Sequence, residues 1–245
     1  VVIGYNDGGN NNYGTAVVGT VSGTSISFGT PVVFETAETT YISLTFDSNL
    51  NKVVIAYRDS GNSGYGTSIV GTVSGTSISF GTAAVFESAS TTYVSATFDS
   101  ANNKVVIAYQ DSGNSDYGTA VVGTVSGTSI SFGTAVVFAA ASTYYNSATF
   151  DSTNNKTVIA YRGTSNYGTA IIGTVSGTSI SFGTPVVFAA ASSNNTHITF
   201  DSTNGKIIIA YKDNGTAEGR VIAGTVSGTS ISFGTPVVFN AGSTT

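Results

Sequence analysis

One stretch of twelve residues occurs five times in this chain, and that repetition limits the possible folds more than any other feature. A second string, VVIAY or a close variant, recurs at the same interval. Equivalent units of about fifty residues bury their apolar faces by stacking on their neighbours, so the fold must be a series of like units. The first string, GTVSGTSISFGT, begins at Gly19, Gly71, Gly123, Gly173 and Gly224, with spacings of 52, 52, 50 and 51 residues.

Each copy predicts four antiparallel strands, which we name a, b, c and d. Alternating apolar and polar residues indicate strand a, a run that is apolar on both faces indicates strand b, and no segment has the periodicity of a helix. A glycine-containing turn joins strands c and d, as in a tight hairpin. In the second copy the strands are expected at Tyr41–Asp47, Lys52–Arg58, Tyr65–Val73 and Thr76–Phe86.

The apolar pattern of strand b predicts how the units stack. A strand that is apolar on both faces needs cover on both sides, and four-stranded sheets packed between copies of themselves provide it. We therefore predict one all-β domain over residues 1–245, a five-bladed β-propeller of four-stranded antiparallel blades. The alternative is a β-solenoid, whose coils are usually shorter. The repeats start at strand b, at Val1, Val53, Val105, Thr157 and Ile207.

The first unit begins at strand b and so lacks its strand a. The missing piece corresponds to 41–52 of the second unit. We expect a longer natural chain to supply this strand at one end and to close the ring.

Composition narrows the choice of partners. Charged residues make up only 9%, the net charge is −5, and the eight Lys and Arg residues do not cluster. A nucleic-acid-binding surface needs a basic patch, so we expect no nucleic-acid partner. No apolar run approaches the ~20 residues of a membrane span, so we expect no membrane insertion. The surface, rich in Ser, Thr, Asn and Gly, suits an extracellular protein or the surface of a cell or virion.

The repeats resemble the β-propeller family, and five copies are similar in number to the blades of tachylectin-type propeller lectins. The strings GTVSGTSISFGT and VVIAY also resemble Ser/Thr/Gly-rich repeats in proteins of marine viruses and bacteria. The resemblance extends over the whole chain and implies a propeller that binds carbohydrate. The chain has no Trp and no Asp-box, WD or kelch motif, so no ligand residue is carried over.

Differences between the copies indicate the binding face. The a–b turns (DSNLNK, DSANNK, DSTNNK, DSTNGK) and the c–d turn (VSGTS) hardly change, whereas the b–c and d–a loops vary. Because strand direction alternates, the two variable sets lie on one face, which we predict to be the binding face. In the constant a–b turn, Asp47 and Lys52 are expected to cap the turn and to form an exposed ion pair.

The predicted ligand-binding residues are tyrosines and polar groups at strand ends on that face. A tyrosine ring can stack on a sugar ring while short amides and carboxylates bind its hydroxyls, and several weak sites act together through avidity. The simpler alternative is that these are strand formers and solvated loop charges. The residues are Tyr41, Tyr93 and Tyr145 at the start of strand a, Arg58, Gln110, Arg162 and Lys212 at the end of strand b, Asp59 and Asp111 after it, and Tyr65, Tyr117 and Tyr167 at the start of strand c.

Catalytic and metal sites are not expected. His197 is the only histidine and replaces a serine of strand a, and the glutamates form no repeated pair. We predict no enzyme activity and no cofactor. Calcium at Asp7–Asn12 or Asp111–Asp116 is an alternative, although neither loop matches the EF-hand pattern and turn chemistry explains the same residues.

The sequence thus favours a recognition module for a surface glycan or receptor. The alternative is a structural or display element of a virion or extracellular assembly, with attachment to a larger assembly as its interaction.

Overall fold

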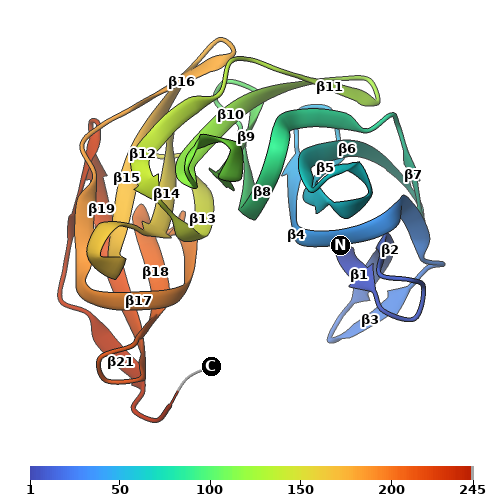
Figure 1. Ribbon diagram of the computed structural model, residues 1–245. Helices are drawn as coiled ribbons and strands as arrows, with labels where there is room; N and C mark the ends of the chain where they lie inside the picture. Colours follow the sequence, from blue (N-terminus) through green and yellow to red (C-terminus); the bar gives the residue numbers. More distant parts are fainter. Residues whose placement is uncertain (244–245) are drawn as a thin grey trace.

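The computed structural model describes residues 1–243, and within them the chain is all-β. Twenty-one strands form two antiparallel sheets of twelve and nine strands, and three short 3-10 turns interrupt them. The units follow one another around an open arc, with β1 and β21 on either side of its gap (Figure 1). None of the helical turns is long or apolar enough to cross a membrane within this part of the chain.

Unit 2 illustrates the strand arrangement. The second half of β4 pairs with β5, β5 with β6, and β6 with both β7 and the first part of β8. The outermost strand d is therefore two pieces, β7 and the start of β8, interrupted at 81–83. The prediction of one continuous strand d was wrong here. The bounds are β4 Val32–Asp47, β5 Lys52–Asp59, β6 Tyr65–Ser74, β7 Ser77–Phe80 and β8 Ala84–Asp99.

The predicted d–a loops are also strands. The first part of β4 pairs with β2 of unit 1 and its second part with β5 of unit 2, so one strand crosses from sheet to sheet. β8 and β17 do the same. Between units 3 and 4 the strand is broken at Thr143, which separates β12 from β13 and the twelve-stranded sheet from the nine-stranded one.

The other units repeat this pattern. Unit 1 has β1 Val2–Asp7, β2 Tyr13–Ser22 and β3 Ser25–Phe28, and unit 3 has β9 Lys104–Asp111, β10 Tyr117–Ser126, β11 Ser129–Phe132 and β12 Val136–Ser142. Unit 4 has β13 Tyr144–Asp151, β14 Lys156–Arg162, β15 Tyr167–Ser176, β16 Ser179–Phe182 and the start of β17 Val186–Asp201. Unit 5 has the rest of β17, β18 Lys206–Asp213, β19 Glu218–Ser227, β20 Ser230–Phe233 and β21 Val237–Asn240. The 3-10 turns are η1 Ser60–Asn62, η2 Ser112–Asn114 and η3 Thr164–Asn166.

Strand b of units 2, 3 and 4 is buried on both of its faces, as its sequence predicts. In β5, Val54 and Ala56 belong to the cluster shared with unit 3, whereas Val53, Ile55 and Tyr57 belong to the cluster shared with unit 1. Successive side chains of a strand point to opposite faces, so one strand packs against both neighbours.

The constant a–b turns are capped by their aspartates. Asp47 is buried and accepts hydrogen bonds from the backbone N–H groups of Asn49 and Leu50 at 2.9 and 3.0 Å. The expected ion pair is absent among the described residues, because the Nζ of Lys52 donates instead to the hydroxyl of Thr72 at 2.7 Å. The turn therefore holds by backbone capping and not by charge.

Adjacent units meet closely at the break in the outer strand. A Cβ added to Gly29 would lie 1.9 Å from the carbonyl oxygen of Thr76 in the next unit, and the same distance recurs for Gly81, Gly133 and Gly183. Only glycine allows so close an approach of two backbones. Gly234, in the last unit, has no such neighbour among the described residues.

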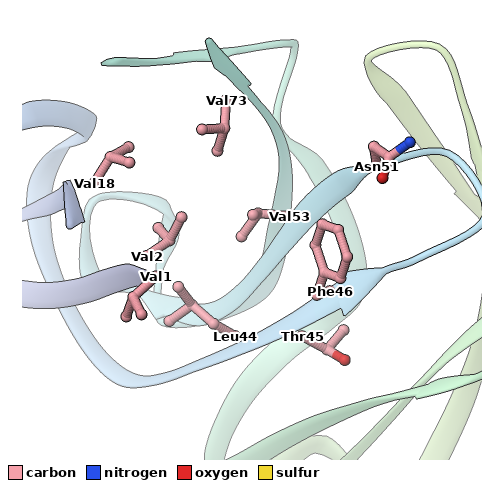
Figure 2. A pocket seen from close by; sticks show the side chains of 9 residues that line it. All are labelled: Val1, Val2, Val18, Leu44, Thr45, Phe46, Asn51, Val53 and Val73. Carbon is pink, nitrogen blue, oxygen red and sulfur yellow. The ribbon is translucent and has the colours of Figure 1, made fainter. Parts of the chain in front are cut away.

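The arc ends at β1 in an apolar groove. Among the described residues β1 pairs only with β2, so its outer edge is unpaired. Beside it lies a cavity of about 560 Å³, and Figure 2 shows the side chains of Val2, Leu44, Phe46 and Val53 around it. Phe46 is 54% exposed, whereas Phe98, its equivalent in unit 3, is 9% exposed.

Candidate functional site

The predicted tyrosines of strand a adopt an unusual backbone conformation. Tyr41, Tyr93 and Tyr145 have φ angles of 51°, 50° and 53°, and Asn195 takes the same place with 50°. The left-handed region costs a bulky residue about 1–3 kcal/mol and is most often occupied at functional sites. A bulge in the pairing with strand b lies at this point in units 2 to 5. Asn195, a residue that tolerates this conformation, was the only hint of it in the sequence.

These tyrosines form a ladder on the inner side of the arc. The ring centroids of Tyr41 and Tyr93 are 5.2 Å apart, and those of Tyr93 and Tyr145 are also 5.2 Å apart. The guanidinium of Arg162 lies 4.3 Å from the ring centroid of Tyr144 and 5.2 Å from that of Tyr145. Burial, with the neighbouring Tyr41 second, raises the pKa of Tyr93. The structure thus brings four predicted residues together, and Tyr144 is one that the sequence did not single out.

A polar cavity of about 350 Å³ lies next to the ladder, at the inner side of the arc. Two of its buried side chains have no hydrogen-bond partner within the described chain: the amide of Asn146, which is 7% exposed, and the hydroxyl of Thr196, which is 2% exposed. An unpaired buried polar group costs about 1–3 kcal/mol, so both groups favour a polar ligand beside them. Ile42 and Val94 stand at the equivalent positions of units 2 and 3.

A series of serines joins the strands that line this cavity, which we call the central cavity. The hydroxyl oxygen of Ser43 accepts from the N–H of Ala96 at 2.9 Å, Ser95 accepts from Ala148 at 3.0 Å, and Ser147 accepts from Ile198 at 3.2 Å. His197 follows as the fourth member of the series and is exposed. It lines the central cavity, so it is placed to meet a ligand there.

The predicted residues at the end of strand b bridge one unit to the next. The Nε2 of Gln110 donates to the carbonyl oxygen of Thr143 at 2.7 Å, and Nη1 of Arg162 donates to Oδ1 of Asn194 at 2.6 Å. Arg58 reaches Ser90 from its Nε at 3.3 Å. Lys212 lies opposite Asn194 in the strand pairing. Gln110, Arg162 and Arg58 thus link one unit to the next, and of the four residues only Arg162 reaches the ladder.

The predicted aspartates fold the b–c loops. Asp59 accepts from the backbone N–H groups of Gly61 and Asn62, and Asp111 accepts from that of Gly113 at 2.9 Å. Both carboxylates are buried. Tyr65, Tyr117 and Tyr167 begin strand c, and none of them lines the central cavity. Eight of the twelve predicted residues therefore lie in the loops or strands and do not converge on the ladder.

The part of the chain that the structure describes holds no group of three or more His, Asp or Glu side chains suited to a metal ion. A scan against models of known protein families finds no match for the chain, and a search of curated proteins finds no matching sequence.

Proposed function

We propose that the five units are the blades of a β-propeller whose ring closes when a strand of type a adds to the outer edge of β1. Four of the five b strands already pair with such a strand. The groove in Figure 2 presents at β1 the apolar residues that strand a covers elsewhere. A strand with the sequence of residues 95–98 (Ser, Ala, Thr, Phe) would cover these apolar residues.

The closure is tested by supplying the strand in trans. A peptide with the sequence of residues 93–104 should bind the chain one to one and raise its melting temperature, because ligands of the folded state stabilise it. The matched control is the same peptide with alanine in place of the phenylalanine that corresponds to Phe98. Equal effects of both peptides, or none, would contradict the proposed closure.

We infer that the chain is a recognition module that binds carbohydrate, without catalysis, at the central cavity. The observation that carries this inference is the pair of buried, unpartnered groups on Asn146 and Thr196 beside the rings of Tyr93 and Tyr145. Aromatic rings stack on the apolar face of a sugar, and amide and hydroxyl groups pair with its hydroxyls. Such a site suits a module outside a cell or on a virion surface.

The carbohydrate site is tested by replacing Asn146 with the residue that the chain itself has at the equivalent position of unit 3. A glycan array with the native protein should identify a ligand, and Asn146→Val should abolish that binding, because Val94 occupies the same place in unit 3. The variant should be at least as stable as the native chain, since it removes an unpaired buried amide. Absence of any glycan binding would favour the structural or display role instead, and unchanged binding by the variant would move the site elsewhere.

A further inference from the structure

The inner tyrosine of strand b has a carboxylate partner in two units. The hydroxyl of Tyr57 donates to Oε2 of Glu35 at 3.1 Å, and that of Tyr109 donates to Oε2 of Glu87 at 3.1 Å. Burial, followed by the neighbouring carboxylate, raises the pKa of each tyrosine. Each glutamate comes from the strand that crosses between the two units, so its carboxylate fills the space beside the ring.

Unit 4 has the tyrosine without the carboxylate. Ala139 stands where units 1 and 2 supply Glu35 and Glu87, and Gly163 stands where Asp59 and Asp111 begin the loop. Tyr161 is 3% exposed, and its hydroxyl has no hydrogen-bond partner among the described residues. The ring of Tyr161 is held as in the other units. Its centroid lies 5.2 Å from that of Phe138, and the centroids of Tyr109 and Phe86 in unit 3 are also 5.2 Å apart.

A cavity of about 400 Å³ occupies the space that these replacements leave. The b–c loop of unit 4 is two residues shorter than that of unit 3, which opens the space towards solvent. The volume is within the range of small-molecule sites, and the walls are mostly apolar. They include Ala139, Ala140, Tyr161, Tyr167, Pro185 and Val187.

We propose that this cavity binds a small organic carboxylate whose oxygen accepts from the Tyr161 hydroxyl, in the place that the Glu87 carboxylate takes in unit 3. The apolar part of the ligand packs against Ala140, Pro185 and Val187. Units 2 and 3 contain the same tyrosine–carboxylate pair within the chain, so the complex has two internal precedents. The inference rests on unit 4 alone and depends on neither the ring closure nor the sugar site.

Unit 5 shows why unit 4 is the favoured location. Ala189 also replaces the glutamate there, but the buried carboxylate of Asp213 remains beside Tyr211. Asp213 pairs with Arg220 at 3.4 Å, and Arg220 pairs with Glu218 at 2.7 Å, so unit 5 already has the chain's own charged groups near Tyr211. In unit 3 the carboxylate at the place of Asp213 is Asp111, which stands second to burial in raising the pKa of Glu87. Gly163 removes this charge from unit 4.

The test uses benzoate as the probe and the whole chain as the receptor. Saturation-transfer NMR should detect benzoate binding to the native chain, and Tyr161→Phe should weaken it roughly tenfold or more, because a hydrogen bond to a charged group is lost. Ala139→Glu should also abolish it, by placing the chain's own carboxylate on Tyr161. Ala139→Gln should abolish binding too, because its neutral amide fills the same place without adding a buried charge. Melting curves check that each variant folds.

Three results would overturn the proposal. The first is that benzoate does not bind the folded native chain. The second is that Tyr161→Phe and Ala139→Gln bind it as the native chain does. The third is that benzyl alcohol binds as tightly as benzoate, which would show that the carboxylate is not recognised. A sugar that binds at the central cavity leaves each of these outcomes unchanged.

Discussion

Two places in the molecule have equivalent residues in different surroundings: the junction between units 2 and 3, and the free edge beside β1. At the junction, Phe98 belongs to a buried cluster that includes Val54 and Val70 of unit 2. At the edge, Phe46 faces the groove of Figure 2 and is mostly exposed. The two phenylalanines occupy the same place in the repeat, so the neighbouring unit and not the local sequence decides which one contributes to the core.

The largest difference is expected for the two phenylalanines themselves. Phe98→Ala should lower the free energy of unfolding by about 3–5 kcal/mol, as for a buried aromatic ring. Phe46→Ala should change it by no more than about 0.5 kcal/mol, as for a surface substitution. Urea unfolding followed by circular dichroism measures both. A loss below about 1 kcal/mol for Phe98→Ala would argue against layered packing between the units.

The glycines at the unit junctions give the next largest contrast. Gly133→Ala would place a Cβ 1.9 Å from the backbone oxygen of Thr178, so one of the two backbones must move. We expect a loss of about 3 kcal/mol, the upper end for overpacked sites. In Gly234→Ala the added Cβ meets only the carbonyl oxygen of Ala223, at 3.8 Å, so the change should be neutral or slightly stabilising. The same unfolding experiment compares them, and equal losses would show that the close approach does not hold the units together.

The sequence predicted the elements that depend on local pattern. Val53 to Tyr57 are apolar at every position, which required cover on both faces, and Asp47 sits where a turn needs a cap. The crossing strand β4 was missed because its middle, ETAETT, is polar and resembles a loop. There Thr39 is buried, because β4 exchanges one sheet partner for the next at this point. Pairing of one strand with β2 before it and with β5 after it is not written in a local pattern.

The candidate sites were predicted only in part. Tyr41, Tyr93 and Tyr145 were found from their alignment, but their left-handed backbone and the stacking of Arg162 depend on three-dimensional packing. The central cavity was missed because Asn146 replaces Val94 at a position that strand a was expected to bury. The cavity at Tyr161 had a signal in the sequence: the loss of both carboxylates and the shorter loop all fall in one unit.

A smaller effect is expected at alkaline pH, where a deeply buried tyrosine differs from an exposed one. Burial raises the pKa of Tyr161 from 10.0 to about 12. Between pH 10 and about pH 12, Tyr161 has released its hydroxyl proton in the unfolded chain but keeps it in the folded chain. The folded state then binds more protons, so its stability falls as pH rises through this window and stays lower above it.

Tyr161→Phe removes that loss, which we estimate at about 2 kcal/mol. The measurement is the urea midpoint below pH 10 and again near pH 12, compared between the native chain and the variant. Tyr167→Phe is the control, since it removes the same hydroxyl from an exposed side chain. A native-like pH dependence for Tyr161→Phe would mean that the burial of this ring does not hold its proton.

The smallest effect concerns the serines that join successive units around the central cavity. Ser95→Ala removes the acceptor for the N–H of Ala148, and a typical net loss for one hydrogen bond is about 1 kcal/mol. His197→Ala, at the same repeat position beside the gap of the arc, should cost less, because the described chain places no following strand beside it (Figure 1).

If the peptide that closes the ring is added, His197 gains a neighbour, and its substitution should then reduce the stabilisation by the peptide. An effect of His197→Ala that is the same with and without the peptide would mean that the added strand does not lie next to unit 5.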